Sequence, residues 1–254
     1  PVGTSFIVRH AVNRGRALGA NGVFGTVGVA TAALIAGTLT DGWGWRMAFV
    51  APGLVCVTTG ILFLVFTDAE DNRMASKKPD AAKATLDRQQ IIRAFIILAM
   101  TMTCAGFIAQ GFLVAVPKIF SERVTLAGFE GITGTSSLVT LTLLVGASGQ
   151  LLGGRLAEHY SIKYVYLFMY VLMIPLAVAS ANLVGAPLVV AAASFQLVLA
   201  SSLPAENCLV ARFCPDGWHA RAYGAKFVLA LGVASLAVPI TGLIRDSTGG
   251  FFWF

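Results

Sequence analysis

Long apolar runs separated by short polar stretches fill almost the whole of this chain. Between Ala17 and Thr40 there is no Asp, Glu, Lys or Arg, and similar runs recur along its 254 residues. A hydrocarbon core about 30 Å thick needs roughly 20 apolar residues in a helix that rises about 1.5 Å per residue. The runs therefore predict membrane-spanning helices, and the fold class is an all-α polytopic membrane protein.

The apolar pattern predicts both complete and partial spans. We expect complete spans at residues 17–40, 47–67, 94–117, 132–154, 163–181, 186–210 and 222–244. Partial spans are expected at 1–8 and 247–254, because the chain opens inside one apolar run and closes where another starts. The natural protein is therefore predicted to be longer at both ends.

Composition supports a membrane location. Hydrophobic residues make up 57% of the chain and charged residues 12%, whereas about a quarter of a typical soluble protein is charged. The mean hydropathy is +0.79. A soluble domain of this length could not bury so much apolar surface, so the lipid bilayer is the first predicted partner.

The charged residues divide between the two sides of the predicted spans. Of the 18 Lys and Arg, 14 lie in "RHAVNRGR", the loop 68–93, "GRLAEHYSIK" and "RFCPDGWHARAYGAK". The positive-inside rule places these segments in the cytoplasm. The net charge of +6 is therefore a topology signal, and no nucleic-acid partner is expected.

The loop 68–93 differs from the other connections, which are short. It carries mixed charges, Pro79 and several Ala, as a solvated linker does. We predict a domain boundary here: residues 1–67 end one helical bundle, 68–93 form a cytoplasmic linker, and 94–254 form most of a second bundle.

The sequence contains an internal repeat. With an offset of 205, "RGRALGANG" (14–22) aligns with "HARAYGAKF" (219–227), and ten identities occur without a gap between Arg16 and Gly44. Arg16 pairs with Arg221 and Asp41 with Asp246, so the polar residues that flank the span recur at both ends. Both spans run outward from the cytoplasm, as a duplicated set of six spans requires.

This arrangement resembles the major facilitator superfamily. "RGRALG" followed by a Gly-rich span and "GWRMAF" (44–49) is similar to that family's fifth helix and the start of its sixth. "GGRLAEHYSIK" (153–163) resembles its cytoplasmic signature between helices eight and nine, with Glu158 where Asp is usual and Ser161 where Gly is usual. The resemblance implies two six-helix bundles related by a parallel repeat, seen here from the end of helix four to the start of helix twelve.

Two charged residues lie inside predicted spans. Glu206 precedes Arg212 by six residues, and Lys226 follows Arg221 by five. Their spans are consecutive and antiparallel, so the two residues have similar depth and can form an ion pair. Two interpretations stay open: a structural pair, with Lys226 able to snorkel, or a site for a coupling ion or an anionic substrate.

Polar residues at matching depth suggest a gate. Asn21 lies five residues after Arg16, and Gln150 lies five before Arg155. In the family fold their helices face each other across the two halves, so an Asn21–Gln150 hydrogen bond could keep the cytoplasmic side closed. Ordinary helix packing is the alternative.

Amides supply further candidates for binding a solute. Gln110 and Gln196 fall on helices that the resemblance places around the central cavity, and Asn207 follows Glu206 directly. Such amides suit a small polar or weakly charged organic solute.

Small residues characterise the first full span. They allow helices to approach closely in lipid, and the predicted packing glycines are Gly22, Gly25, Gly28 and Gly37. In family antiporters this helix carries Gly-Pro before Gly-Gly, but here the matching places hold Ala32, Ala33 and then Ala36, Gly37. This difference weakens the interpretation as a proton-coupled drug exporter.

Enzymatic and metal chemistry find no support in the sequence. It has no Walker loop, HExxH motif, nucleophile elbow or paired membrane carboxylates. The four cysteines lack metal-like spacing, and His10, His159 and His219 lie in predicted loops. We therefore predict no enzyme, no metal and no cofactor.

The sequence thus predicts a secondary active transporter that moves a small organic solute by alternating access. It would act as a monomer in the plasma (inner) membrane, with H⁺ or Na⁺ as candidate coupling ions. The alternatives are an efflux protein for hydrophobic compounds and a membrane sensor or receptor that has lost transport.

Overall fold

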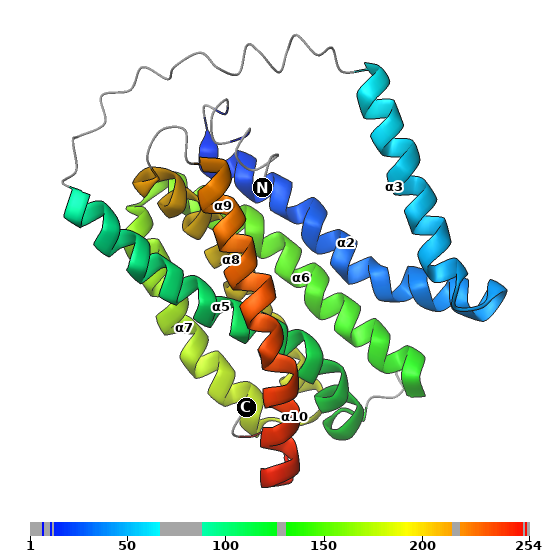
Figure 1. The fold of residues 1–254 in the computed structure, drawn as a ribbon. Helices are drawn as coiled ribbons and strands as arrows, with labels where there is room; N and C mark the ends of the chain where they lie inside the picture. Colours follow the sequence, from blue (N-terminus) through cyan, green and yellow to red (C-terminus); the bar gives the residue numbers. More distant parts are fainter. Residues whose placement is uncertain are drawn as a thin grey trace. The chain divides into compact units, whose positions relative to one another are not determined.

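Every regular element of the described chain is helical (Figure 1). The computed structural model describes residues 7, 11, 13–66, 88–125, 131–214, 219–250 and 252. The α-helices are α2 (Arg14–Trp43), α3 (Met47–Phe66), α5 (Arg88–Arg123), α6 (Gly131–His159), α7 (Ile162–Asn182), α8 (Gly185–Phe213), α9 (His219–Phe227) and α10 (Ala237–Thr248). The predicted all-α fold class is confirmed.

The observed helices match the predicted spans closely. Six helical stretches of the described chain are long and apolar enough to cross a membrane, the last of them running from Arg221 to Thr248. The remaining predicted span, 17–40, lies within α2, whose 30 residues are more than a membrane span needs. α5 begins at Arg88, so the end of the predicted linker 68–93 is helical. α10 extends to Thr248, so residues 247–248 belong to it and not to a following span.

Some predictions fall outside the described residues. Of the partial span 1–8 only Ile7 is described, and of residues 251–254 only Phe252. Residues 67–87, most of the predicted linker, also lie outside that part of the chain.

The chain divides into two compact units, and the division falls within α2. Residues 1–30 and 86–254 form the first unit, and residues 31–85 form the second. The predicted bundle boundary at 68–93 remains a prediction.

The second unit contains the end of α2, a tight turn and α3. Gly44 has a φ of 87°, a conformation that glycine adopts without steric cost. The Trp45 and Phe49 rings meet edge to face at 6.4 Å, and the Arg46 guanidinium lies 5.4 Å from the centre of the Trp45 ring. These contacts order the turn between the two helices.

In the first unit α8 is the central helix. Its buried residues occur all around it, as expected for a helix that packs on several sides. α6 packs on α8 through Gly146, Gly149 and Gly153: a Cβ atom at Gly149 would meet the Leu197 carbonyl, and one at Gly153 the Ser201 carbonyl. Small residues therefore bring the two backbones together.

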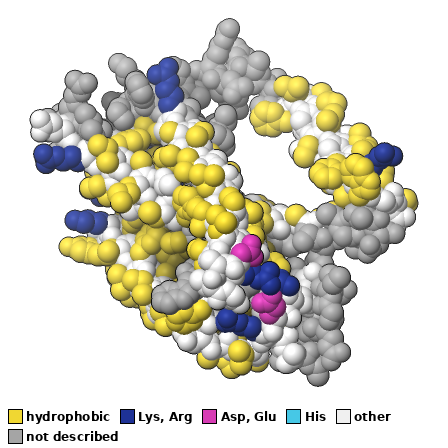
Figure 2. Space-filling view, turned by 60° about the horizontal axis from the view of Figure 1, so that its bottom comes forward, with side chains coloured by type: hydrophobic (Ala, Val, Ile, Leu, Met, Phe, Trp, Pro, Cys, Tyr) yellow, Lys and Arg dark blue, Asp and Glu magenta, His cyan; other side chains and the backbone are white. Residues whose placement is uncertain are grey.

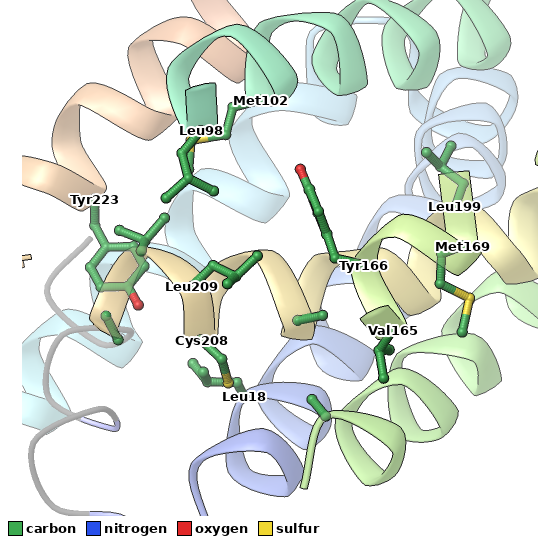
Figure 3. Packing of buried hydrophobic residues seen from close by; sticks show 14 of the residues in the cluster. Leu18, Leu98, Met102, Val165, Tyr166, Met169, Leu199, Cys208, Leu209 and Tyr223 are labelled. Carbon is green, nitrogen blue, oxygen red and sulfur yellow. The ribbon is translucent and has the colours of Figure 1, made fainter. Parts of the chain in front are cut away.

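A large hydrophobic cluster joins the helices of the first unit (Figure 3). It takes Leu18 from α2, Met102 from α5, Val165 from α7, Leu209 from α8 and Tyr223 from α9. The described part of α2 up to residue 30 therefore shares a core with the helices that follow residue 88.

The outer surface is also apolar. The face in Figure 2 is mostly hydrophobic, with acidic and basic side chains in a few small groups. Large side chains such as Phe168, Ile174 and Val190 are 60% exposed or more. A surface of this kind suits lipid and not water.

The prolines have different effects on the spans. α7 and α8 continue through Pro175 and Pro204. By contrast, the predicted last span changes its hydrogen-bond pattern before Pro239: a π-helix (Val228–Gly232) and a 3₁₀-helix (Val233–Leu236) separate α9 from α10. Only this span is irregular among the described ones.

Candidate functional site

A buried ion pair lies at the centre of the candidate site. Lys226 Nζ of α9 lies 2.7 Å from Glu206 Oε1 of α8, and the two side chains are 8% and 2% exposed. Antiparallel neighbouring helices bring the two residues to the same depth, as the sequence predicts. The partners of the pair lie on α7, α8 and α9, which all belong to the first unit.

Neighbouring polar groups complete a small network around the pair. Tyr166 Oη of α7 donates to Glu206 Oε2 at 3.2 Å, and Lys226 Nζ donates to Asn207 Oδ1. Tyr223 Oη also donates to the Asn207 main-chain carbonyl at 2.7 Å. Each charged group therefore has hydrogen-bond partners beyond the ion pair, which offsets part of the cost of burying it.

A second phenol extends the network along α7. The hydroxyls of Tyr166 and Tyr170 lie 3.3 Å apart, and the rings meet edge to face at 4.8 Å. Neither tyrosine is among the predicted site residues, although their spacing of four places them on one face of a predicted span. Among the described residues, no buried side-chain nitrogen or oxygen lacks a hydrogen-bond partner.

Gln150 forms the polar contact between α6 and α2, but with a different partner from the predicted one. Its Nε2 donates to Thr26 Oγ1 at 2.7 Å, and its side chain fills the space beside Gly22. Asn21 is exposed. Gly19, Gly22 and Thr26 share one face of α2, whereas Asn21 lies about 100° away from Gly22 around the helix.

Glycines bring α2 and α6 into backbone contact. A Cβ atom at Gly15 would lie 2.5 Å from the Gly154 carbonyl oxygen, and one at Gly19 would lie 2.6 Å from that of Gln150. Of the predicted packing glycines, Gly22 contacts Gln150, whereas a Cβ atom added at Gly25 or Gly28 would meet no atom of the described residues within 4 Å. The surroundings of Gly37 lie outside the described side chains.

An ion pair closes the end of this interface. Glu158 of α6 accepts from the main-chain N–H of Arg16 at 2.8 Å and pairs with its Nε at 2.9 Å. The carboxylate therefore caps the first turn of α2, where a negative charge is favourable. Glu158, which stands where Asp is usual in the family signature, has the reach to make both contacts.

The remaining candidate amides lie apart from the ion pair. Gln110 of α5 and Gln196 of α8 are half-buried, and Gln196 lies against Gly146 of α6. The Phe112 and Phe195 rings, 5.2 Å apart, join α5 and α8 close to these amides in sequence. Asn207 is the candidate amide that the structure brings to the Glu206–Lys226 pair.

Within the described residues, no three His, Cys, Asp or Glu side chains come together as they would to hold a metal ion.

The apolar spans, the buried ion pair and the glycine-mediated helix contacts define an α-helical, multi-pass integral membrane protein. The sequence profile of the Major Facilitator Superfamily matches residues 1–239. The chain therefore belongs to this family.

Solved structures support the same fold. A crystal structure of the E. coli fucose:proton symporter FucP is 13% identical, with a TM-score of 0.60 over 83% of this chain and 52% of that one. Another FucP structure, in the outward conformation, is 16% identical with the same coverage and TM-score. The chain spans about half the length of these transporters. No curated protein sequence matches it significantly.

Proposed function

We propose that the protein is a secondary active transporter, not an enzyme, and that it moves a small organic solute across the membrane by alternating access. Membership of the Major Facilitator Superfamily supports this class. The observation that carries the proposal is the close contact of α2 with α6 through Gly15, Gly19 and Gly154. Such a contact between small residues can separate and re-form without interlocking side chains.

The topology follows from the same proposal. α2 and α3 would end the first six-helix bundle, residues 68–93 would link the bundles in the cytoplasm, and residues 94–254 would supply most of the second. The distribution of Lys and Arg supports this orientation. We place the protein in the plasma (inner) membrane as a monomer.

The α2–α6 interface would act as the cytoplasmic gate. Gln150 and Thr26 form a hydrogen bond within an apolar interface, and Arg16 and Glu158 close its end. Under this proposal, the observed arrangement would be the one in which the cytoplasmic side between the two helices is shut. When the gate opens, water would replace these contacts. The free-energy cost of this exchange is small for the partly exposed Arg16–Glu158 pair.

Solute and coupling ion would use different groups. Gln110 and Gln196 are uncharged hydrogen-bonding side chains, which suit a neutral polar solute. Glu206, paired with Lys226 and linked to Asn207 through that lysine, is the candidate for coupling to H⁺, with Na⁺ as the alternative. Loss of the Glu206 charge would leave a net positive charge inside the bundle, so it would favour a rearrangement around Lys226.

Uptake into proteoliposomes tests the proposal. The purified full-length protein should accumulate at least one labelled solute from a panel of neutral sugars, including fucose, and small organic acids. Saturable flux that is abolished by dissipating the ion gradient is the expected result. Binding without flux would instead indicate a sensor, and flux of hydrophobic dyes alone would indicate an efflux protein.

Replacement of the carboxylate tests the coupling site. Glu206→Gln should abolish accumulation against a gradient while leaving exchange of solute across the membrane intact, because exchange needs no net ion movement. The control is Asp246→Asn, which removes an exposed carboxylate of α10. Wild-type flux that ignored both pH and sodium would contradict ion coupling through Glu206.

A further inference from the structure

The irregular part of the last span has a clear origin in the sequence. Pro239 has no N–H to donate to the Ser235 carbonyl, and its ring would clash with that carbonyl in a continuous α-helix. Gly232 adds no side chain that would stiffen the segment, and a Cβ atom added there would meet only Val228 Cγ1, at 3.9 Å. Residues 228–236 therefore form the π-helix and the 3₁₀-helix described above. Such irregular turns are often found at functional bends.

The two ends of this span are tied to different helices. On one side, Lys226 of α9 contacts Glu206 and Asn207 of α8. On the other side, Arg245 Nη2 of α10 lies 2.6 Å from Glu122 Oε1 of α5. The polar contacts therefore fix α9 to α8 and α10 to α5.

Between these two attachments the contacts are apolar and small. A Cβ atom at Gly106 of α5 would lie 2.7 Å from the Ala230 carbonyl oxygen and 2.9 Å from the Ala234 Cβ. The side-chain hydrogen bond of this segment is local, from Ser235 Oγ to the Gly232 carbonyl at 2.6 Å. Such a smooth contact holds the segment close to α5 without fixing its direction.

We propose that residues 228–236 are a hinge and that the contacts of Lys226 with Glu206 and Asn207 are the latch that holds α9 closed against α8. When the latch opens, α9 turns away from α8 while α10 stays on α5. This inference goes beyond the proposed transport activity, because it concerns the resting structure and requires no solute.

The energetics favour a latch over simple stabilisation. A buried ion pair contributes little net stability compared with apolar residues of similar size, although loss of one partner is costly. α9 has only nine residues and buries few of them, chiefly Ala222, Tyr223 and Lys226. Tyr223 packs in the hydrophobic cluster and donates to the Asn207 main-chain carbonyl, and Lys226 supplies the charged contact with α8, so the ion pair is one of the contacts that hold this short helix in place.

Hydrogen exchange of the full-length protein in lipid nanodiscs tests the hinge. In Lys226→Met, where Glu206 keeps the Tyr166 hydroxyl as a partner, amide exchange in residues 219–236 should become about tenfold faster or more. Tenfold corresponds to a loss of about 1.4 kcal/mol in local stability. Exchange in 237–248 should not change.

A matched variant breaks the other attachment. Glu122→Gln should speed exchange in residues 237–248 and leave 219–227 unchanged. The charge-swapped protein carrying Glu206→Lys and Lys226→Glu should return 219–236 towards the wild-type rate. Both results are expected if each end of the span is held by its own ion pair.

A third variant addresses the hinge itself. Pro239→Ala restores the missing N–H, so in the Lys226→Met background it should slow exchange across 228–236. Unchanged exchange in Lys226→Met would contradict the latch. Faster exchange that spreads over α7 and α8 would also contradict it, because it would show that the pair stabilises the whole bundle.

Discussion

Depth along a helix is the property of a single residue that the sequence predicts best. Counting from Arg212 and Arg221 places Glu206 and Lys226 at the same level, and the structure brings their charges to 2.7 Å. Direction around the helix is harder to predict. Asn21 has the right depth for Gln150 but points elsewhere, and Thr26, just over one turn further along α2, receives the hydrogen bond.

Tyr166 is a second residue whose direction around its helix the sequence does not predict. Nothing in the sequence around Tyr166 indicates that its hydroxyl reaches Glu206, 40 residues later, because that contact depends on how α7 and α8 rotate against each other. A tyrosine in an apolar span is consistent with burial, with lipid or with the membrane surface. Only the packed structure distinguishes these positions.

Removal of the Tyr166 hydroxyl should destabilise the protein. Tyr166→Phe deletes a hydrogen bond to a buried carboxylate, for which a loss of about 1–3 kcal/mol is expected. Thermal unfolding of the detergent-solubilised full-length protein measures the change. Tyr164→Phe is the control, because Tyr164 lies on the same helix and is 69% exposed; equal effects of the two variants would contradict the buried role of Tyr166.

At the scale of elements, helix positions are predictable from the sequence and helix irregularity is not. The apolar runs predict α3, α7 and α8 within about three residues at each end, because the bilayer sets the length of a span. Pro175, Pro204 and Pro239 each lie within an apolar run, so the sequence does not distinguish their effects. Only Pro239 accompanies a change of helix type, and this depends on the packing around each proline.

The close packing of α6 on α8 should be sensitive to a single methyl group added at a contact glycine. Gly153→Ala places a methyl group against the Ser201 carbonyl, and such overpacking is expected to cost about 1–3 kcal/mol. The measurement is again the unfolding temperature of the full-length protein.

Gly25→Ala provides the comparison, because an added Cβ atom there meets nothing within 4 Å. It should leave the unfolding temperature unchanged or raise it, since alanine favours a helix over glycine. A larger loss from Gly25→Ala than from Gly153→Ala would contradict the close packing of α6 on α8.

For the whole molecule, the repeat of "RGRALGANG" in "HARAYGAKF" indicates the architecture from the sequence alone. The match of the Major Facilitator Superfamily profile over residues 1–239 confirms the family that this repeat helps to indicate. The solute cannot be predicted in the same way, because the described spans carry only two buried charges, and these neutralise each other within one bundle.

The most direct test of alternating access is to lock the α2–α6 contact. Thr26→Cys and Gln150→Cys would be combined in a background without the exposed Cys56 and Cys104, and joined by a short, reducible thiol-specific cross-linker. Either cysteine alone, treated in the same way, is the control. The measurement is solute uptake by the full-length protein in proteoliposomes. We predict that cross-linking stops uptake and that reduction restores it, and unchanged uptake after complete cross-linking would contradict alternating access through this contact.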